Sequence, residues 1–170
     1  MLQIVFIIIQ LGFVVYLAYF CFAFLSGAPF VPSTSPVAEK MVELARLKKG
    51  QTIYDLGSGD GRILKLAATH GARAIGLEIN PWLVLYTTLR YGFGRYPGTV
   101  RTHWRNFWRQ NYRDADVIFV YLLPWHMNKL ADKLKQELKP GAIVVTNSFI
   151  IPGWKQIRQD AAQHVYVYKA

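Results

Sequence analysis

A glycine-rich turn between two apolar segments is the feature that most constrains this chain. It covers residues 55–62, with the sequence DLGSGDGR, after the apolar run 52–54 and before a helical pattern at 63–68. A strand, a glycine turn and a helix in this order are typical of a nucleotide-binding site. Glycines at such a turn let the backbone bend tightly and approach a ligand without interference from a Cβ atom. The turn therefore predicts a nucleotide-like ligand at the carboxyl end of a β-strand.

An acidic residue follows at a suitable offset. The next apolar run, 74–77, ends in Glu78, which comes about twenty residues after Asp55, where a carboxylate commonly binds ribose hydroxyls. The glycine spacing is G-x-G-x-G, which is tighter than the dinucleotide pattern G-x-G-x-x-G, and an aspartate precedes it. This pattern resembles the S-adenosylmethionine site of class I methyltransferases. The alternative interpretation is a glycine-rich turn that binds no ligand.

The rest of the chain alternates between strand and helix patterns. We expect strands near 52–56, 73–78, 98–103, 115–121 and 141–147, and helices near 37–47, 61–70, 81–92 and 125–138. Alternating units of this kind predict a mainly parallel sheet. The segments 155–159 and 164–169 predict a C-terminal antiparallel hairpin. Together these elements predict an α/β, Rossmann-like class I methyltransferase fold with a seven-stranded sheet.

The N-terminal segment differs in composition from everything after it. Residues 2–25 are almost wholly apolar, and no Asp, Glu, Lys or Arg precedes Glu39. A segment of this length that is apolar on all sides predicts one transmembrane helix before the domain. A cleaved signal peptide is the alternative, but it would have a basic start and a shorter apolar core. We therefore expect a transmembrane anchor at 1–28, a proline-rich connector at 29–36 and a methyltransferase domain at 37–170.

Charge predicts the orientation of this anchor. Lys40, Arg46 and Lys48 follow the apolar segment, whereas no basic side chain precedes it. The excess of basic residues on the cytoplasmic side of membrane proteins therefore predicts a single-pass membrane protein with its catalytic domain in the cytoplasm or a topologically equivalent compartment. The one cysteine, Cys21, lies within the expected anchor, so disulfides cannot contribute to the fold.

The formal net charge of +10 fits two kinds of partner, a nucleic acid or an anionic membrane surface. Arginines at 101, 105, 109 and 113 alternate with aromatic residues at 104, 107, 108 and 112, which resembles a surface on which bases stack. A basic face turned toward anionic lipid is the interpretation we favour in a chain with an expected anchor. Nucleic acid is the less favoured partner.

Four segments together resemble one family of enzymes. They are the Pro-Phe-Val-Pro-Ser entry at 29–33, YDLGSGDGRI at 54–63, GLEINPWL at 76–83 and YVY at 166–168. The chain is similar to the membrane-tethered class I protein-lysine N-methyltransferases related to the enzymes that modify the ATP synthase c-subunit and the adenine nucleotide translocase. The resemblance implies S-adenosylmethionine as the cofactor.

It also implies a set of cofactor-binding residues. The glycine loop is expected to face the methionine moiety, with Asp55 near its amino group, Glu78 on the ribose, and Asn106 with Phe107 on the adenine. The family tends to have Asp at position 106, but an amide oxygen can also accept a hydrogen bond from the adenine amino group. The expected cofactor-binding residues are Asp55, Gly57, Ser58, Gly59, Glu78, Asn80, Asn106 and Phe107.

The substrate pocket is less well defined by the sequence. The segment 121–124, YLLP, lacks the Asp/Asn-Pro-Pro clamp that holds a planar amine in many amino-group methyltransferases, which argues against methylation of a base. Pro32, Ser33, Tyr121 and Pro124 are candidates for the pocket, and no catalytic base is identified. Phe30 and Trp125 are further candidates for its apolar walls. The histidines show no metal-ligand spacing, so no metal site is expected.

We therefore expect transfer of a methyl group from S-adenosylmethionine to an accessible lysine of an integral membrane protein. One alternative is a methyltransferase that acts on nucleic acid or on a small lipophilic molecule. Another is a module that binds the cofactor without catalysis. The sequence does not identify the substrate, the number of methyl groups added or the oligomeric state.

Overall fold

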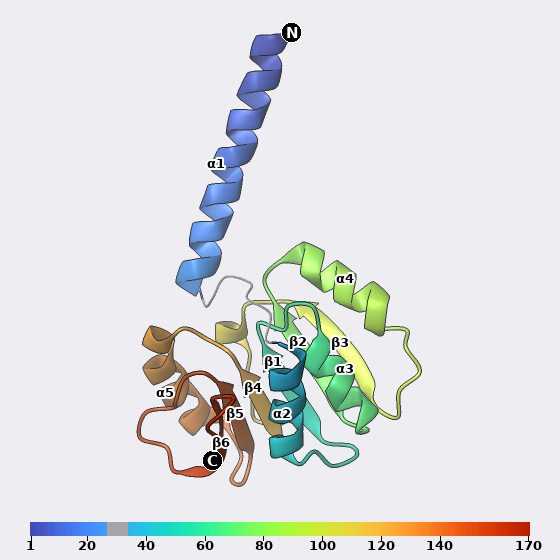
Figure 1. The fold of residues 1–170 in the computed structure, drawn as a ribbon, viewed down its shortest axis with the longest axis vertical. Coiled ribbons are helices and arrows are strands. Elements are labelled where there is room, and N and C mark those ends of the chain that lie inside the picture. The colour runs from blue at the N-terminus through green and yellow to red at the C-terminus, as the bar shows by residue number, and fades with distance from the viewer. Residues whose placement is uncertain (27–33) are drawn as a thin grey trace.

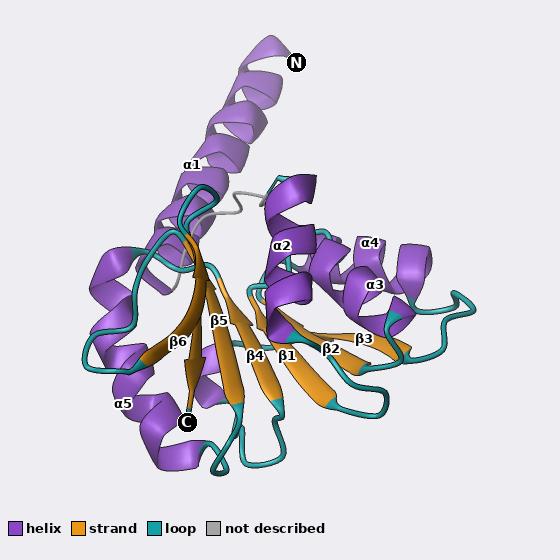
Figure 2. Cartoon of the chain, turned by 60° about the horizontal axis from the view of Figure 1, so that its bottom comes forward, coloured by secondary structure: helices purple, strands orange, loops and turns teal. Residues whose placement is uncertain are grey.

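A seven-stranded mixed sheet forms the centre of the fold, with helices on both of its faces (Figures 1 and 2). The computed structural model describes the backbone at residues 1–26 and 34–170, and the side chains at these positions except 19, 20 and 22–26. The strands are β1 (Thr52–Leu56), β2 (Arg73–Glu78), β3 (Thr99–Trp104), β4 (Val117–Val120), β5 (Ile143–Asn147), β6 (Gln156–Asp160) and β7 (Val165–Lys169). The helices are α1 (Leu2–Ser26), α2 (Ser35–Ala45), α3 (Arg62–Thr69), α4 (Pro81–Tyr91) and α5 (Met127–Glu137), with 3-10 turns η1 (Phe107–Arg109) and η2 (Pro124–His126).

The strand order is β3-β2-β1-β4-β5-β7-β6, and all neighbouring strands from β3 to β5 pair in parallel. Strand β7 runs antiparallel between β5 and β6, as the hairpin signal at the C-terminus predicts. The expected Rossmann-like sheet is therefore confirmed. The one marked difference is β4, which is shorter than the apolar run that predicts it because the chain turns away from the sheet at Tyr121 and enters η2 at Pro124.

The prediction of a transmembrane helix before this domain is wrong. A bilayer-spanning helix needs about 20 consecutive apolar residues. Within residues 1–26 and 34–170, as far as they are described, no helix combines the necessary length and apolar character. The pocket candidates Pro32 and Ser33 lie outside the described residues, as does Phe30.

Helix α2 begins at Ser35, inside the segment expected to be connector. Thr34 is the residue before the first helical turn, and its side chain makes no capping hydrogen bond. Pro36 lies in the first turn, where its missing N–H would have no helical partner in any case. Proline therefore helps to start this helix although its side chain cannot cap it.

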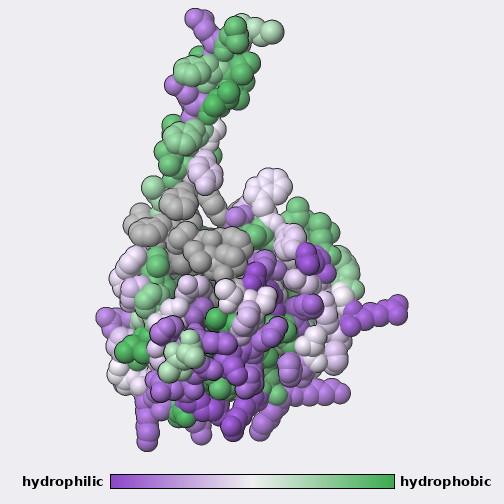
Figure 3. Space-filling model, viewed as in Figure 1, coloured by the Kyte–Doolittle hydropathy of each residue, from purple (hydrophilic) through white to green (hydrophobic). Residues whose placement is uncertain are grey.

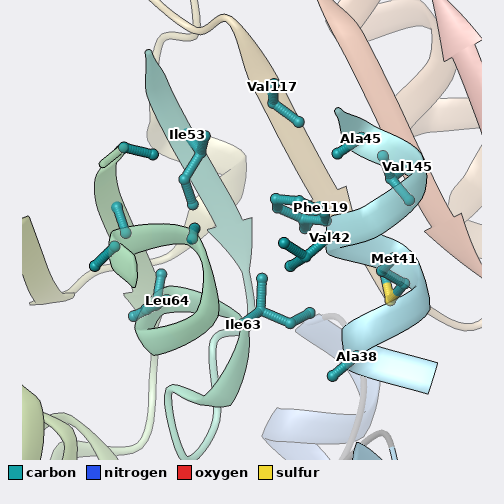
Figure 4. Close-up of a cluster of buried hydrophobic side chains, with 14 of the residues drawn as sticks. Ala38, Met41, Val42, Ala45, Ile53, Ile63, Leu64, Val117, Phe119 and Val145 are labelled. Atoms are coloured by element: carbon teal, nitrogen blue, oxygen red, sulfur yellow. The ribbon is translucent and has the colours of Figure 1, made fainter. Parts of the chain in front are cut away.

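Two apolar cores lie on opposite faces of the sheet. On one face, α2 and α3 pack on alternate residues of the central strands, among them Ile53 of β1 and Phe119 of β4 (Figure 4). On the other face, α5 packs over side chains that include Ile118 and Tyr168. Both faces of the central strands are buried, which explains their nearly continuous apolar sequence.

A close backbone contact holds the edge strand β3 to the domain. The N–H of Gly98 donates to Ala68 O at 3.0 Å, and the N–H of Thr99 donates to Ala72 O at 3.0 Å. A Cβ atom at position 98 would lie 2.1 Å from the carbonyl oxygen of Ala72. Because the carbonyl oxygen belongs to the backbone and the backbone fixes the position of a Cβ atom, neither can move away by a rotamer change.

We expect Gly98→Ala to lower the free energy of unfolding by about 1–3 kcal/mol, the usual effect of forcing extra volume into a packed site. Urea denaturation monitored by circular dichroism measures this change. Gly12→Ala is the matched control, because a Cβ atom at Gly12 meets no atom within 4 Å. Equal stability of the Gly98→Ala and Gly12→Ala proteins would show that β3 shifts freely at this edge.

Candidate functional site

The carboxyl ends of β1, β2 and β4 meet at one edge of the sheet. The register pairs Leu56 with Leu77 of β2 and with Val120 of β4, so the residues that follow these three positions lie side by side. The strand order reverses between β1 and β4, and ligands of open α/β sheets bind at such a switch point. The candidate site is therefore built from Gly57, Glu78 and Tyr121 and their neighbours.

The glycine loop has a backbone that only glycine adopts without strain. Gly57, Gly59 and Gly61 have φ angles of 77°, 53° and 77°. The N–H groups of Gly57 and Ser58 both donate to Leu77 O, at 2.9 and 3.2 Å. The loop is thereby bonded to the end of β2 and presents its backbone at the carboxyl edge.

Glu78 holds this loop through its side chain. Its Oε2 accepts a hydrogen bond from Gly59 N–H at 2.9 Å, and its Oε1 accepts from Ile79 N–H and Asn80 N–H, each at 2.9 Å. A carboxylate offers about four lone-pair positions. Oε2 can therefore accept one more hydrogen bond, which suits the predicted contact with a ribose hydroxyl.

Asp55 is buried near the end of β1. Burial raises the pKa of Asp55 to about 8, with smaller contributions from the negative charges of Glu78 and Asp60. A cation placed beside the carboxylate would favour its ionised form. Asp55 therefore suits the predicted contact with a ligand ammonium group.

Two further residues fix the position of the loop. A Cβ atom at Gly76 would lie 2.5 Å from Ser58 Oγ and 2.6 Å from Leu64 Cδ1, so only glycine lets the loop pack on β2 here. Thr87 of α4 is fully buried and donates a hydrogen bond from Oγ1 to Gly59 O at 3.1 Å. Neither residue is among the predicted site residues. A glycine inside a strand was a usable signal for Gly76, whereas nothing in the local sequence marks Thr87.

The loop ends in an ion pair at the start of α3. The Arg62 guanidinium lies 2.6 Å from the Asp60 carboxylate, and this hydrogen bond holds the pKa of Asp60 below its usual range. Asp60 is therefore an ionised neighbour of the site. Its charge adds to that of Glu78 around Asp55.

The two predicted asparagines serve as helix caps. Asn80 Oδ1 accepts from Trp82 N–H at 2.9 Å at the start of α4, and Asn106 Oδ1 accepts from Trp108 N–H at 2.9 Å at the start of η1. Asn80 Oδ1 also accepts from Leu83 N–H at 3.4 Å and so uses both of its lone pairs, whereas Asn106 Oδ1 keeps one. A ligand contact through either residue stays a prediction. Phe107 is buried in the core on the α5 side, which leaves little of its ring exposed for stacking on adenine.

An aromatic cluster lies beyond β3 and β4. The ring of Trp108 lies 5.8 Å from that of His126, and the ring of Trp125 lies 6.1 Å from His126. Lys129 Nζ lies 4.6 Å from the centre of the Trp108 ring. Of the pocket candidates in the described part of the chain, half-buried Tyr121 leads into this cluster and exposed Pro124 begins η2 within it.

The end of β5 adds a polar pair to the same edge. Asn147 is buried, and its Oδ1 accepts a hydrogen bond from Ser148 Oγ at 2.9 Å. Ser148 has a φ angle of 66°, an uncommon conformation for a residue other than glycine. Sequence reasoning did not include Asn147, although a polar residue directly after an apolar strand was a signal for it.

Comparisons with known proteins agree with this geometry. The protein-lysine N-methyltransferase of Saccharolobus islandicus (strain REY15A) is 33% identical over 134 residues, which are 78% of this chain and 83% of that protein. The ATP synthase c-subunit lysine N-methyltransferase of Mus musculus is 36% identical over 126 residues, which are 74% of this chain and 51% of that protein. The chain covers 51% to 61% of the length of the mouse, human and rat relatives of this name.

A solved structure supports the fold. The crystal structure of an RNA methyltransferase from Salinibacter ruber in complex with S-adenosyl-L-homocysteine is 36% identical, with a TM-score of 0.75, and covers 82% of this chain and 92% of that chain. The model of the ANTKMT methyltransferase domain matches residues 55–158, from Asp55 before the glycine loop into β6. The chain therefore belongs to the family of the ANTKMT methyltransferase domain.

Proposed function

We propose that this protein transfers a methyl group from S-adenosylmethionine to a lysine side chain of a protein. The observation that carries the proposal is the pair of buried carboxylates around the glycine loop. Glu78 Oε2 bonds to Gly59 N–H with one acceptor position left, and Asp55 lies beside it at the end of β1. This pair fits a ligand that has both ribose hydroxyls and an ammonium group.

The cofactor site fits S-adenosylmethionine for physical reasons. Gly57 has no side chain, and a Cβ atom there would meet no protein atom within 4 Å, so a ligand can approach the backbone at this point. Asp55 supplies a negative charge for the ammonium group, and Glu78 supplies an acceptor for the ribose. The similar structure from Salinibacter ruber was solved in complex with S-adenosyl-L-homocysteine, which supports the same cofactor.

The cofactor would supply an electrophilic methyl group on a positively charged sulfur. Transfer forms a bond from the lysine nitrogen to the methyl carbon and breaks the carbon–sulfur bond, which leaves S-adenosylhomocysteine and a methylated ammonium ion. The amine must be neutral to react, and an apolar environment favours its neutral form. Tyr121, Pro124 and Trp125 would line that environment, hold the amine in line with the methyl group and exclude water.

We infer that the substrate is a membrane protein. Relatives of this chain are named for the ATP synthase c-subunit and for adenine nucleotide translocase as their substrates. Since this chain covers only part of those relatives, the substrate of the whole protein is part of the proposal. No residue of the described structure is assigned as a catalytic base.

RNA is the second candidate substrate, because the solved structure from Salinibacter ruber carries the name of an RNA methyltransferase. The predicted stacking surface between residues 101 and 113 supports it only in part. Trp104 is exposed, but Phe107 and Tyr112 are buried and cannot stack on bases. The segment 121–124 also lacks a clamp for a planar base amine.

Glu78→Gln is expected to weaken binding of S-adenosylmethionine by about 1.5–3 kcal/mol, roughly tenfold to a hundredfold, because the charge of the acceptor is lost. Isothermal titration calorimetry measures the affinity. Asp132→Asn is the control, because Asp132 is exposed on α5, on the opposite face of the sheet from α3. Unchanged affinity in the Glu78→Gln protein would exclude Glu78 from the ligand site.

Cofactor affinity should also depend on pH through Asp55. Its pKa is raised to about 8 in the free protein, so the carboxyl must lose a proton before it binds an ammonium group. Affinity should therefore fall as the pH drops below about 8, and binding at pH 7 should release a proton. Calorimetry in buffers of different ionisation enthalpy detects this proton. Asp55→Asn should bind more weakly and release no proton at this site.

The same shift predicts how stability depends on pH. A folded-state pKa above the unfolded value of about 3.9 favours the protonated form in the folded protein. The contribution of Asp55 to the stability of the ligand-free protein is therefore fully present below pH 4 and is lost as the pH rises toward 8. Asp55→Asn should reduce this loss, as urea denaturation at several pH values would show.

The reaction is tested by methyl transfer from tritium-labelled S-adenosylmethionine to membrane proteins, RNA and extracted lipid, each supplied separately. We expect label in the protein fraction, recovered as methyl-lysine after hydrolysis, and at least tenfold less label with Asp55→Asn. Label in RNA that depends on Asp55 would replace the lysine proposal with the second candidate. Binding of the cofactor without transfer to any fraction would contradict both.

A further inference from the structure

The outer surface of α4 exposes the largest group of apolar side chains in the described domain that follows α1. Trp82 is 76% exposed, Leu89 is 64% exposed and Phe93, just after the helix, is 80% exposed. Leu85 and Tyr86 are exposed between them, and we name these five residues the α4 face. With 3.6 residues per turn, they fall within an arc of about 100°. Figure 3 shows hydrophobic side chains over α4 at the upper right of the domain.

The apolar stripe of α4 faces away from the core, unlike that of an ordinary surface helix. A helix on a globular domain normally turns its apolar stripe toward the core. In α4 the one buried residue is Thr87, a polar residue that bonds to Gly59 O, while the apolar stripe faces outward. Packing within the domain therefore does not explain why α4 is apolar on this side, and an exposed patch of this kind marks an interaction surface.

The surroundings of the α4 face are basic. Residues 79–113 contain six arginines and no Asp or Glu. The Arg90 guanidinium lies 5.5 Å from the ring centres of both Tyr86 and Tyr91, and Arg95 follows on the exposed loop. Arg90 acts on the carboxylate of Asp60, which forms its ion pair with Arg62. A partner that matches this surface has an apolar interior and a negatively charged border.

We propose that the α4 face docks on the surface of an anionic lipid bilayer. Leu85 and Leu89 lie between Trp82 and Phe93 along the helix, and an aliphatic side chain can enter the boundary between headgroups and acyl chains. Bases of RNA stack on aromatic side chains, not on leucines, so RNA matches the centre of the face less well. The aromatic and arginine residues around the leucines are of the kind that lies at membrane interfaces.

Docking in this way brings the candidate site to the bilayer. Helix α4 starts at Pro81, three residues after Glu78, and Thr87 connects its buried side to the glycine loop. A protein docked through the α4 face would therefore hold the cofactor edge of the sheet next to the headgroups. The docking proposal concerns binding alone and stands whether the methyl acceptor is lysine or another group.

The test uses the full chain with Cys21→Ser, so that a single new cysteine can carry a fluorescent label. Labels are placed at Leu89→Cys or Phe93→Cys on the α4 face, and at Ile157→Cys on β6 as the control. Ile157 is also apolar and exposed, but it lies on the strand at the opposite edge of the sheet from β3. Binding of S-adenosylhomocysteine, measured by calorimetry, verifies that each labelled protein is folded.

Vesicles of phosphatidylcholine with phosphatidylglycerol should shift the emission of labels 89 and 93 to the blue and remove most of their quenching by aqueous iodide. Label 157 should change little. Pure phosphatidylcholine should have a smaller effect, and high salt should weaken the effect of the anionic vesicles because it screens the arginines. In the unlabelled chain, Leu85→Gln with Leu89→Gln should lower binding to anionic vesicles severalfold without changing affinity for S-adenosylhomocysteine.

Three results would overturn the proposal. If labels 89 and 93 stay open to iodide while the protein sediments with vesicles, another element makes the membrane contact. If an RNA oligonucleotide protects them and vesicles do not, the surface binds nucleic acid. If they are protected without any addition, in proportion to protein concentration, the face joins two copies of the chain. None of these results depends on methyl transfer, so a failure of the lysine proposal is detected separately.

Discussion

The hydrogen bond from Gly59 N–H to the Glu78 carboxylate is the contact on which the candidate site depends. It joins the glycine loop after β1 to the end of β2, together with the hydrogen bonds from Gly57 and Ser58 N–H to Leu77 O. Without it, a buried N–H group would lack a partner, which costs about 1–3 kcal/mol. The same carboxylate accepts Ile79 N–H and Asn80 N–H, so it also shapes the turn into α4.

Helix α4 is held to the domain by this arrangement and by Tyr91, which packs against the core. Thr87 bonds to Gly59 O, and the threonine methyl group would touch any Cβ atom at Gly61, so the helix rests directly on the loop. Its apolar side chains are left on the outside as a consequence. The surface proposed to meet lipid and the loop proposed to hold the cofactor are therefore two sides of one helix.

Much of the site was predictable because its polar groups follow strand ends. Asp55 and Glu78 were recognised from the apolar runs before them, and parallel strands must bring such positions together. Asn80, Asn106 and Phe107 were assigned to the ligand by resemblance, but in the structure the two asparagines cap helices and Phe107 is buried. The transmembrane helix was predicted from the length and apolar composition of residues 2–25, but among the described residues no helix has the length and apolar character needed to cross a membrane.

The sequence by itself determined the alternation of strands and helices, the C-terminal hairpin and the glycine loop, because these depend on periodicity and on backbone freedom at neighbouring residues. Only the tertiary structure decided which polar atoms remain available to a ligand. Glu78 uses all but one of its acceptor positions within the protein. Thr87 bonds to Gly59, which lies 28 positions earlier in the chain. Such contacts are set by distance in space, which the order of residues along one chain does not reveal.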